Sequence, residues 1–280
     1  MLSDPMSRQE PMEDSNILSL KYPLPHAPKS PSPLIDPAPW HCGGEVLHVT
    51  FRADKNNMRL LIPPPLEMGP NPGEGAVWFT EWVSVSESKP DLAFTHPERA
   101  VYRECIVMVG CQYKGRGGLF APCAWIDNDL TYGRGLIQGF PKKTGRVSLT
   151  RLHPLNPRIG GKRIGAKVRG VCLVNAEKVA EGSMVFTRPS EPSELPGIKL
   201  FLLHRFPTIE DPTRAAVHEL TAGRVADVRI ADVWAGDGDL RFFDSILEDL
   251  PDLGQIETTG AFYFSMGMSI LGGEVIYKYV

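Results

Sequence analysis

Most of the chain consists of short apolar runs, rich in β-branched and aromatic residues, separated by polar, glycine and proline positions. Runs of this kind are typical of β-strands. Helical periodicity is rare by comparison, so successive strands are expected to pair antiparallel in a meander, barrel or sandwich. We therefore predict an α+β, mainly β fold with few helices. The predicted strands are 45–52, 77–86, 102–113, 147–151, 163–174, 199–206, 223–234, 261–268 and 274–279, and a further apolar run is 124–126.

Two segments carry helical signals. Asp54 suits the N-cap of a short helix that runs to Leu61 and is stopped by the prolines that follow. In 239–248 the apolar residues recur at helical spacing, which predicts a second helix. We interpret 127–129 as a loop or the start of a helix, and 131–138 as the lead into a pair of lysines.

The first 39 residues differ from the rest of the chain. They hold nine of the 26 prolines and few large apolar side chains. A segment of this composition cannot bury enough apolar surface to fold alone. We interpret 1–39 as a proline-rich arm, flexible or wrapped around a partner subunit, and 40–280 as one domain. The proline-bearing loop 190–197 is the candidate hinge between the halves of that domain.

Composition narrows the function classes. The chain has 280 residues, 42% of them hydrophobic, which is enough to bury a large core. Its formal net charge of −3 argues against nucleic acid or an anionic membrane as the main partner. The five cysteines form no C-x-x-C pair and no histidines have zinc-ligand spacing, so we expect neither a disulfide framework nor a metal site. The polar N-terminus and the lack of a long apolar run predict a soluble, cytoplasmic protein.

One stretch is chemically distinctive: 138–145 places Lys142 and Lys143 side by side, after a proline and between two glycines. An amine nucleophile must be neutral, and lysine at its reference pKa of about 10.4 is neutral in only roughly one molecule in 2,500 at pH 7. A catalytic lysine therefore needs its pKa lowered by burial or by a neighbouring cation. On these residues alone, the alternative is a solvated basic turn.

Glu104 is a second candidate. It stands at the head of the apolar run 105–109, where a charged side chain is costly unless it has a partner. The alternative is a glutamate on a solvated rim at the end of a strand. Glu81 lies among aromatic residues and is a similar but weaker case.

These residues resemble a known family. Pro141-Lys142-Lys143, preceded by Phe140 and followed by Thr-Gly, is similar to the Y-P-K-K-x-G motif of the acetoacetate decarboxylases. Further segments match in order: 126–129 resembles L-D-N-E, 226–236 resembles T-D-V…A-W-x-G, 240–244 resembles L-Q-L-F-D, and 274–277 matches the closing E-V-I-Y. The resemblance runs from Trp40 to Val280.

The resemblance implies a closed, antiparallel, barrel-like sheet in a homo-oligomer. It implies Lys142 as the Schiff-base nucleophile and Glu104 as the active-site glutamate. It also places Glu81, Phe140 and Lys143 around the substrate, and it implies neither a metal nor an organic cofactor. The expected partner is a small keto acid, or a ketone or aldehyde, rather than nucleic acid or a membrane.

One position departs from the family. The decarboxylases carry an active-site arginine where this chain has Gly43 or Gly44. We therefore predict a lysine-dependent carbon–carbon lyase that decarboxylates a β-keto acid. The alternatives are an imine-forming aldolase-dehydratase and a small-molecule binding protein that has lost the chemistry.

The lysine pair itself carries a further prediction. Adjacent side chains of an extended segment point to opposite faces, so Lys143 is expected to face away from Lys142. Burial, rather than repulsion by Lys143, should then lower the pKa of Lys142.

Overall fold

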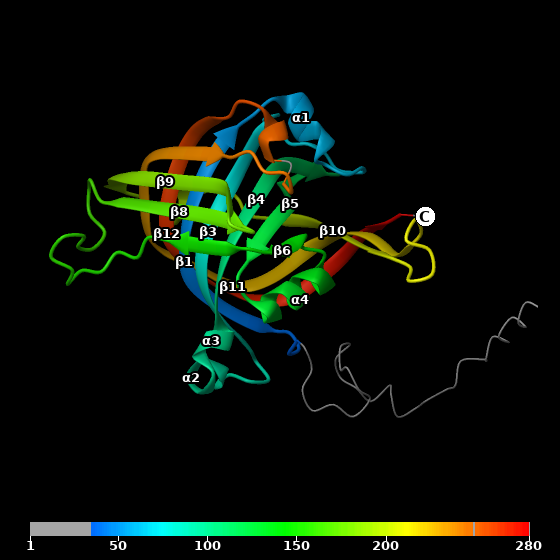
Figure 1. The fold of residues 1–280 in the computed structure, drawn as a ribbon, viewed down its shortest axis with the longest axis horizontal. Coiled ribbons are helices and arrows are strands. Elements are labelled where there is room, and N and C mark those ends of the chain that lie inside the picture. Colours follow the sequence, from blue (N-terminus) through cyan, green and yellow to red (C-terminus); the bar gives the residue numbers. More distant parts are fainter. Residues whose placement is uncertain (1–34, 249, 280) are drawn as a thin grey trace, which may run out of the picture.

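The fold is dominated by one sheet that closes on itself (Figure 1). The computed structural model describes residues 35–248 and 250–279. The strands are β1 (Trp40–Arg52), β2 (Glu67–Met68), β3 (Glu74–Ser86), β4 (Val101–Tyr113), β5 (Arg116–Ile126), β6 (Lys142–Thr144), β7 (Arg146–Leu149), β8 (Lys167–Val174), β9 (Glu177–Pro189), β10 (Leu200–Pro207), β11 (Ala215–Phe242) and β12 (Glu257–Lys278). The helices are α1 (Lys55–Leu60), α2 (Leu92–Thr95), α3 (Pro97–Ala100) and α4 (Asp129–Gln138), with 3₁₀ turns η1 (Pro192–Glu194) and η2 (Leu250–Leu253).

A closed ring is formed by β10, β5, β4, β3, β1, β12 and β11 in that order, because β11 pairs again with β10. Neighbours in the ring are antiparallel except β10 and β5, which pair in parallel through Leu200 and Phe201. β1 lies between β3 and β12, in unbroken register with β3 along its whole length. The mainly β fold and the closed sheet predicted from the sequence are thus confirmed, and the parallel pairing is an addition to them.

Beyond β11 the sheet continues through β9, β8 and β7, which pack over the outside of β1, β3 and β4 (Figure 1). Successive side chains of each ring strand point to opposite faces of the sheet, so the buried side chains fall into two sets. The interior cluster, inside the ring, includes Val46, Trp78 and Phe264. The outer cluster, under β7–β9, includes Leu47 and Phe79. A side chain on β1 or β3 therefore faces either the inside of the ring or the outer layer, depending only on its parity.

The two predicted helices have different outcomes. α1 forms as predicted, and the Asp54 carboxylate accepts the backbone N–H groups of Asn56 at 2.8 Å and Asn57 at 3.1 Å. The helix predicted over 239–248 is wrong, because β11 continues to Phe242 and pairs with β9 there. The apolar side chains that suggested this helix form no buried stripe, and Ile246 is 90% exposed.

Several boundaries also differ from the prediction. α4 forms where the sequence indicated only a loop or a helix start, and β9 was not predicted. β12 is continuous where two strands were predicted, because pairing with β11 resumes on both sides of Gly272, which has a φ of 111°. The strand predicted from residue 163 begins at Lys167.

Residues 1–34 of the predicted arm lie outside the described residues, so this part of the prediction stays untested. The last residues of that segment are packed. Ile35 is fully buried in a small cluster with Trp40 and Leu130, and Asp36 forms an ion pair with Lys89 at 2.6 Å. The predicted hinge 190–197 connects β9 and β10 of the same sheet. Within the described part of the chain, we find no helix with the length and apolar character needed to cross a membrane.

Candidate active site

Helix α4 and the turn after it deliver Lys142 to the inside of the ring. The Asn128 side chain caps α4 by accepting the Thr131 N–H at 3.1 Å. The helix ends at Gly139, whose left-handed φ of 85° suits glycine. β6 then pairs in parallel with β5, with Lys142 opposite Ala124. Because Ala124 belongs to the interior cluster, this register also turns Lys142 inward.

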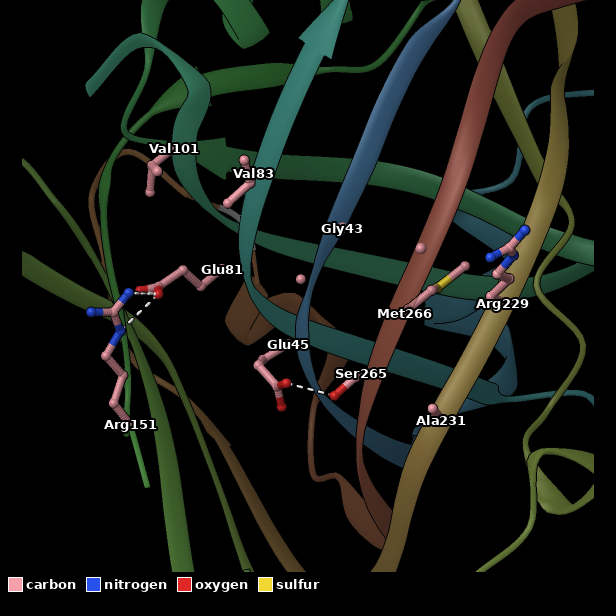
Figure 2. Close-up of a pocket in the computed structure, with 12 residues that line it drawn as sticks. Gly43, Glu45, Glu81, Val83, Val101, Arg151, Arg229, Ala231, Ser265 and Met266 are labelled. Carbon is pink, nitrogen blue, oxygen red and sulfur yellow. Dashed lines mark hydrogen bonds and ion pairs between the residues drawn. The ribbon is translucent and has the colours of Figure 1, made fainter. Parts of the chain in front are cut away.

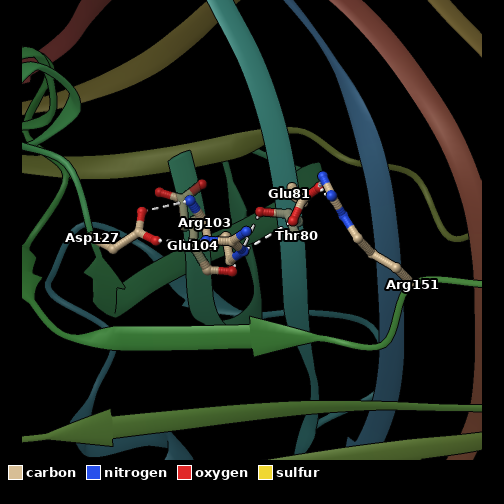
Figure 3. A network of polar contacts seen from close by, with 6 residues as sticks. All are labelled: Thr80, Glu81, Arg103, Glu104, Asp127 and Arg151. Atoms are coloured by element: carbon tan, nitrogen blue, oxygen red, sulfur yellow. Dashed lines mark hydrogen bonds and ion pairs between the residues drawn. The ribbon is translucent and has the colours of Figure 1, made fainter. Parts of the chain in front are cut away.

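The Lys142 amine lies in an enclosed, mainly apolar environment. The side chain is 4% exposed, and its Nζ is 2.9 Å from Oε1 of Glu104 on β4. The Nζ atom also lies 5.2 Å from the centroid of the Phe140 ring and 5.6 Å from that of Tyr102. Thr80 donates its hydroxyl hydrogen to the Glu104 carbonyl at 3.3 Å, which links β3 to β4 at the level of the carboxylate (Figure 3).

Burial lowers the pKa of Lys142 and is the largest influence on it. The negative charge of Glu104 opposes this effect, and the positive charge of Arg134 adds to it. Lys143 is not among the groups that shift the pKa. It faces the other way, 53% exposed, with its Nζ 2.8 Å from the Glu248 carboxylate. The two lysines therefore point to opposite faces, as adjacent residues of an extended segment are expected to do.

Arg134 is a residue of the site that the sequence reasoning missed. It lies on α4, is 2% exposed, and donates to the Ser84 hydroxyl at 2.8 Å and the Tyr102 hydroxyl at 3.0 Å. Its Nε has no hydrogen-bond partner among the described residues. Within the same part of the chain, no carboxylate forms an ion pair with its guanidinium, whose hydrogen bonds go to neutral hydroxyls. A buried cation of this kind is suited to an anionic ligand.

Gly43 and Gly44 stand where the family resemblance led us to expect an arginine, and the structure leaves no room for a side chain at Gly44. A Cβ atom on Gly44 would lie 2.1 Å from the Glu81 carbonyl oxygen and 2.8 Å from the Trp82 ring. Such approaches are too close for any side chain, so this backbone admits only glycine at 44. The cation near Lys142 is supplied instead by Arg134, from a different element of the fold.

Gly135 allows α4 to lie against the lysine. A Cβ atom at this position would be 2.4 Å from Cδ of Lys142 and 2.9 Å from its Cγ. The lysine stem therefore occupies the space that a side chain on the helix would fill. No feature of the sequence pattern alone identifies this contact.

Glu81 lies on the other face of the sheet from Glu104. On β3 it is the neighbour of Thr80, so its side chain points away from the ring interior. It forms ion pairs with Arg103 at 2.9 Å and with Arg151 (Figure 3). Glu81 and Arg151 line a cavity of about 380 Å³ on that outer face, and their ion pair is drawn in Figure 2. The structure therefore brings together Lys142, Glu104 and Phe140, and it leaves Glu81 and Lys143 apart from them.

Metal ligands are a separate question. Within the described residues, no group of three or more histidine, cysteine, aspartate and glutamate side chains is arranged to hold a metal ion. The expectation of a site without metal or cofactor remains a prediction.

A buried lysine beside a glutamate, inside a closed ring of sheet, is the arrangement that the resemblance to acetoacetate decarboxylases led us to expect. The chain belongs to the acetoacetate decarboxylase (ADC) family, whose model matches residues 21–280. The resemblance carried by the lysine motif is thereby confirmed.

Proteins similar to this chain include named acetoacetate decarboxylases and an enzyme with a different name. Acetoacetate decarboxylase 2 of Mesorhizobium japonicum is 25% identical over 84% of this chain and 82% of its own length. An acetoacetate decarboxylase-like enzyme from Sphingomonas wittichii RW1 is 29% identical, with a TM-score of 0.85 over 89% of this chain and 97% of that one. The enduracididine biosynthesis enzyme MppR, solved in complex with pyruvate, is 31% identical, with a TM-score of 0.85 over 92% of this chain and 98% of its own. MppR has also been solved with the condensation product of pyruvate and imidazole 4-carboxaldehyde.

Proposed function

We propose that this chain is a lysine-dependent enzyme that forms an imine between Lys142 and a small keto acid and then makes or breaks a carbon–carbon bond. The observation that carries the proposal is the Lys142 amine, 4% exposed and 2.9 Å from the Glu104 carboxylate. Burial lowers its pKa and increases the neutral fraction that can attack a carbonyl. A solvated basic turn has none of these features.

The reaction begins when Nζ of Lys142 attacks the keto carbon and water leaves, giving a protonated imine. The imine then accepts an electron pair from a bond to the adjacent carbon. If a C–H bond is broken, its proton goes to a base, and the enamine can attack an aldehyde and later lose water. If a C–CO₂ bond is broken, CO₂ leaves and the enamine is protonated. Hydrolysis of the imine returns the free amine in both cases.

Glu104 is the group that we assign to proton transfer. Its carboxylate is within hydrogen-bond distance of Nζ, where the carbinolamine and the imine would form. It is held among buried residues of β4, with little solvent to compete for the proton. Glu104→Gln keeps the shape and removes the titrating group, so turnover should fall by roughly 10²–10⁴-fold with the fold intact. An unchanged turnover would assign Glu104 a purely structural role.

Arg134 is the group that we assign to the substrate carboxylate. Its guanidinium lacks a carboxylate partner among the described residues and lies beside Tyr102, which also faces Lys142. An arginine stabilises the carboxylate it binds, and that stabilisation is lost if the carboxylate leaves as CO₂. Arg134 therefore favours a keto acid that keeps its carboxylate, and with it an aldol condensation followed by dehydration. MppR, with its pyruvate complex, is consistent with this choice.

Decarboxylation of a β-keto acid is the second candidate. It is favoured by the curated relatives, since the Mesorhizobium protein and others of about 25% identity are named acetoacetate decarboxylases. For this reaction, the positive charge of Arg134 would lower the pKa of Lys142 without binding the departing carboxylate.

Three measurements separate the candidates. Borohydride reduction in the presence of a ketone should give a covalent adduct at Lys142, and Lys142→Ala should give none. With pyruvate and an aromatic aldehyde, a conjugated product should absorb in the ultraviolet; with a β-keto acid, CO₂ release should be small. Release of CO₂ without a conjugated product would select the decarboxylase. If no ketone gave an adduct, the protein would be a small-molecule binding protein without imine chemistry.

A further inference from the structure

A polar side chain that the proposed chemistry does not use lies inside the ring. His48 on β1 is 1% exposed and contacts two aromatic rings, Trp78 at 5.9 Å and Phe262 at 6.2 Å between centroids. The indole N–H of Trp78 donates to Nδ1 of His48 at 2.8 Å. Its Nε2 has no hydrogen-bond partner among the described residues.

The Trp78 bond determines where the imidazole proton lies. An indole N–H can only donate, so Nδ1 of His48 is an acceptor and carries no proton. Burial lowers the pKa of His48 to about 4, so the ring is neutral near pH 7. A neutral imidazole carries one proton, which therefore lies on Nε2. His48 thus presents a buried N–H donor that has no acceptor in the described protein.

The two ends of the ring differ in how they are covered. The end near Lys142 is covered by α4, where Arg134 contacts Trp40 and Tyr102, and by the buried Ile35. The other end holds a cavity of about 680 Å³, which we call the His48 pocket. Its lining includes His48, Ala76, Gly110, Gly118 and Pro196.

The sheet register places His48 between this pocket and Lys142. Val46 pairs with Thr80, and Thr80 pairs with Glu104. His48 lies two residues further along β1, toward the pocket, and two strands from β4. With about 4.8 Å between strands and about 3.4 Å per residue, the Cα atoms of His48 and Glu104 are about 12 Å apart. This separation is within the length of an extended small-molecule substrate.

We propose that the His48 pocket receives the part of the substrate farthest from the imine carbon, where Nε2–H of His48 donates to an uncharged acceptor. The acceptor would be a carbonyl, a hydroxyl or a ring nitrogen. This inference rests on the proposed function at Lys142 and adds a specificity-determining residue to it. A site that contains a buried donor discriminates strongly against a ligand that leaves this donor unpaired, whereas an apolar wall discriminates weakly. A cationic group is excluded, because a donor cannot solvate it.

The test uses two ketones of the same length, 4-(pyridin-4-yl)butan-2-one and 4-phenylbutan-2-one. Both can form an imine with Lys142, and they differ only in the ring nitrogen. The concentration for half-maximal borohydride trapping on the full-length protein is measured at pH 8, where the pyridine is neutral. We expect the pyridyl ketone to be trapped at a concentration roughly 10- to 100-fold lower. In His48→Phe this ratio should fall to about one, with the phenyl ketone unaffected or trapped better.

A matched variant and a spectroscopic measurement complete the test. Phe262→Leu alters the other ring contact of His48 without removing its donor, so it should keep most of the preference for pyridine. If His48→Phe does not fold, nitrogen-15 spectra of the labelled wild-type protein still decide: the His48 proton must be on Nε2, and its resonance must shift with the pyridyl ketone only. Equal trapping of both ketones by the wild type, or a proton on Nδ1, would overturn the inference while leaving the imine chemistry intact. If neither ketone gave an adduct, both this inference and the proposed imine chemistry would be wrong.

Discussion

Lys142 and Lys143 show how one side chain type acquires two environments at adjacent positions. The former is enclosed by Phe140, Tyr102 and Glu104, and the latter reaches solvent and Glu248. The sequence could predict the first, because the lysine motif and the glutamate at the head of an apolar strand are local signals. It could not predict Arg134, because a single arginine between two glycines becomes part of the site only when α4 is placed across the end of the ring.

The pH dependence of adduct formation tests which charge acts on Lys142. Acetone is a suitable probe because it has no carboxylate for Arg134 to bind. Lys143→Met should leave the pH profile of borohydride trapping unchanged. Arg134→Met removes a positive charge that lowers the pKa of Lys142, so the profile should move to higher pH. Glu104→Gln should move it to lower pH, since the Glu104 charge raises that pKa. A large upward shift in Lys143→Met would contradict this account.

The contact between Gly135 and Lys142 gives a second prediction. Gly135→Ala introduces a methyl group where Cδ of Lys142 now lies, 2.4 Å from the added carbon. The lysine stem must shift from its present position beside Glu104, and trapping of acetone should slow by roughly tenfold or more, since small displacements of a reacting group have large effects on rate. Gly43→Ala is the control, because no atom lies within 4 Å of its added carbon. Equal effects of the two changes on trapping would show that the contact is unimportant.

At the scale of elements, the sequence prediction detected several strands with a long apolar pattern but missed β9, although β9 also has a buried face. β1, β3 and β4 have buried faces along most of their length, and their apolar pattern was detected. Only the middle of β11 was predicted; this part of the strand is mostly exposed, and its pairing with β12 is interrupted by register shifts. The helix wrongly predicted at 239–248 rested on apolar residues of which Leu240 is buried within β11, whereas Ile246 and Leu247 are exposed in the segment after it. Spacing alone does not distinguish a buried stripe from a run of exposed residues.

A buried glutamate joins the segment after β11 to the strand that carries the lysine. Glu248 accepts the Trp125 indole N–H at 3.1 Å and the Lys143 amine at 2.8 Å. Glu248→Ala leaves the buried Trp125 donor unpaired and should lower the free energy of unfolding by about 1–3 kcal/mol. Asp239→Ala, which removes an exposed ion pair with Arg241, should change it by less than about 1 kcal/mol. Urea unfolding measures both. Similar values for the two variants would mean that the Glu248 contacts contribute little to stability.

At the scale of the whole molecule, both ends of the described chain are built into the ring. β1 pairs with β12, and Ile35 packs before β1 begins. The composition of the first residues predicted an arm but could not show where packing starts, since Ile35 stands in a proline-rich segment. Assembly into a homo-oligomer, which the family resemblance implies, remains a prediction.

Truncation of the N-terminus tests where the packed structure begins. Deletion of residues 1–33 should leave the melting temperature nearly unchanged, because that segment has too little apolar surface to anchor a core. Deletion of 1–35 also removes the fully buried Ile35, and Ile35→Ala alone should cost about 2 kcal/mol. Thermal unfolding of these three chains decides the boundary. A large loss of stability in the first of them would place a packed or subunit-bridging element before residue 34.

The pairing of β1 with β12 has a consequence for how the protein is made. During synthesis β1 leaves the ribosome early, but one of its two neighbours is the last strand of the chain, with Trp40 opposite Ile270. Pairings this distant in sequence form slowly, because the long intervening loop must be closed first. Until β12 is released, one edge of β1 is unpaired and the interior cluster is open to water. A growing chain therefore exposes the unpaired edge of β1 until β12 has been made, and an exposed strand edge favours aggregation.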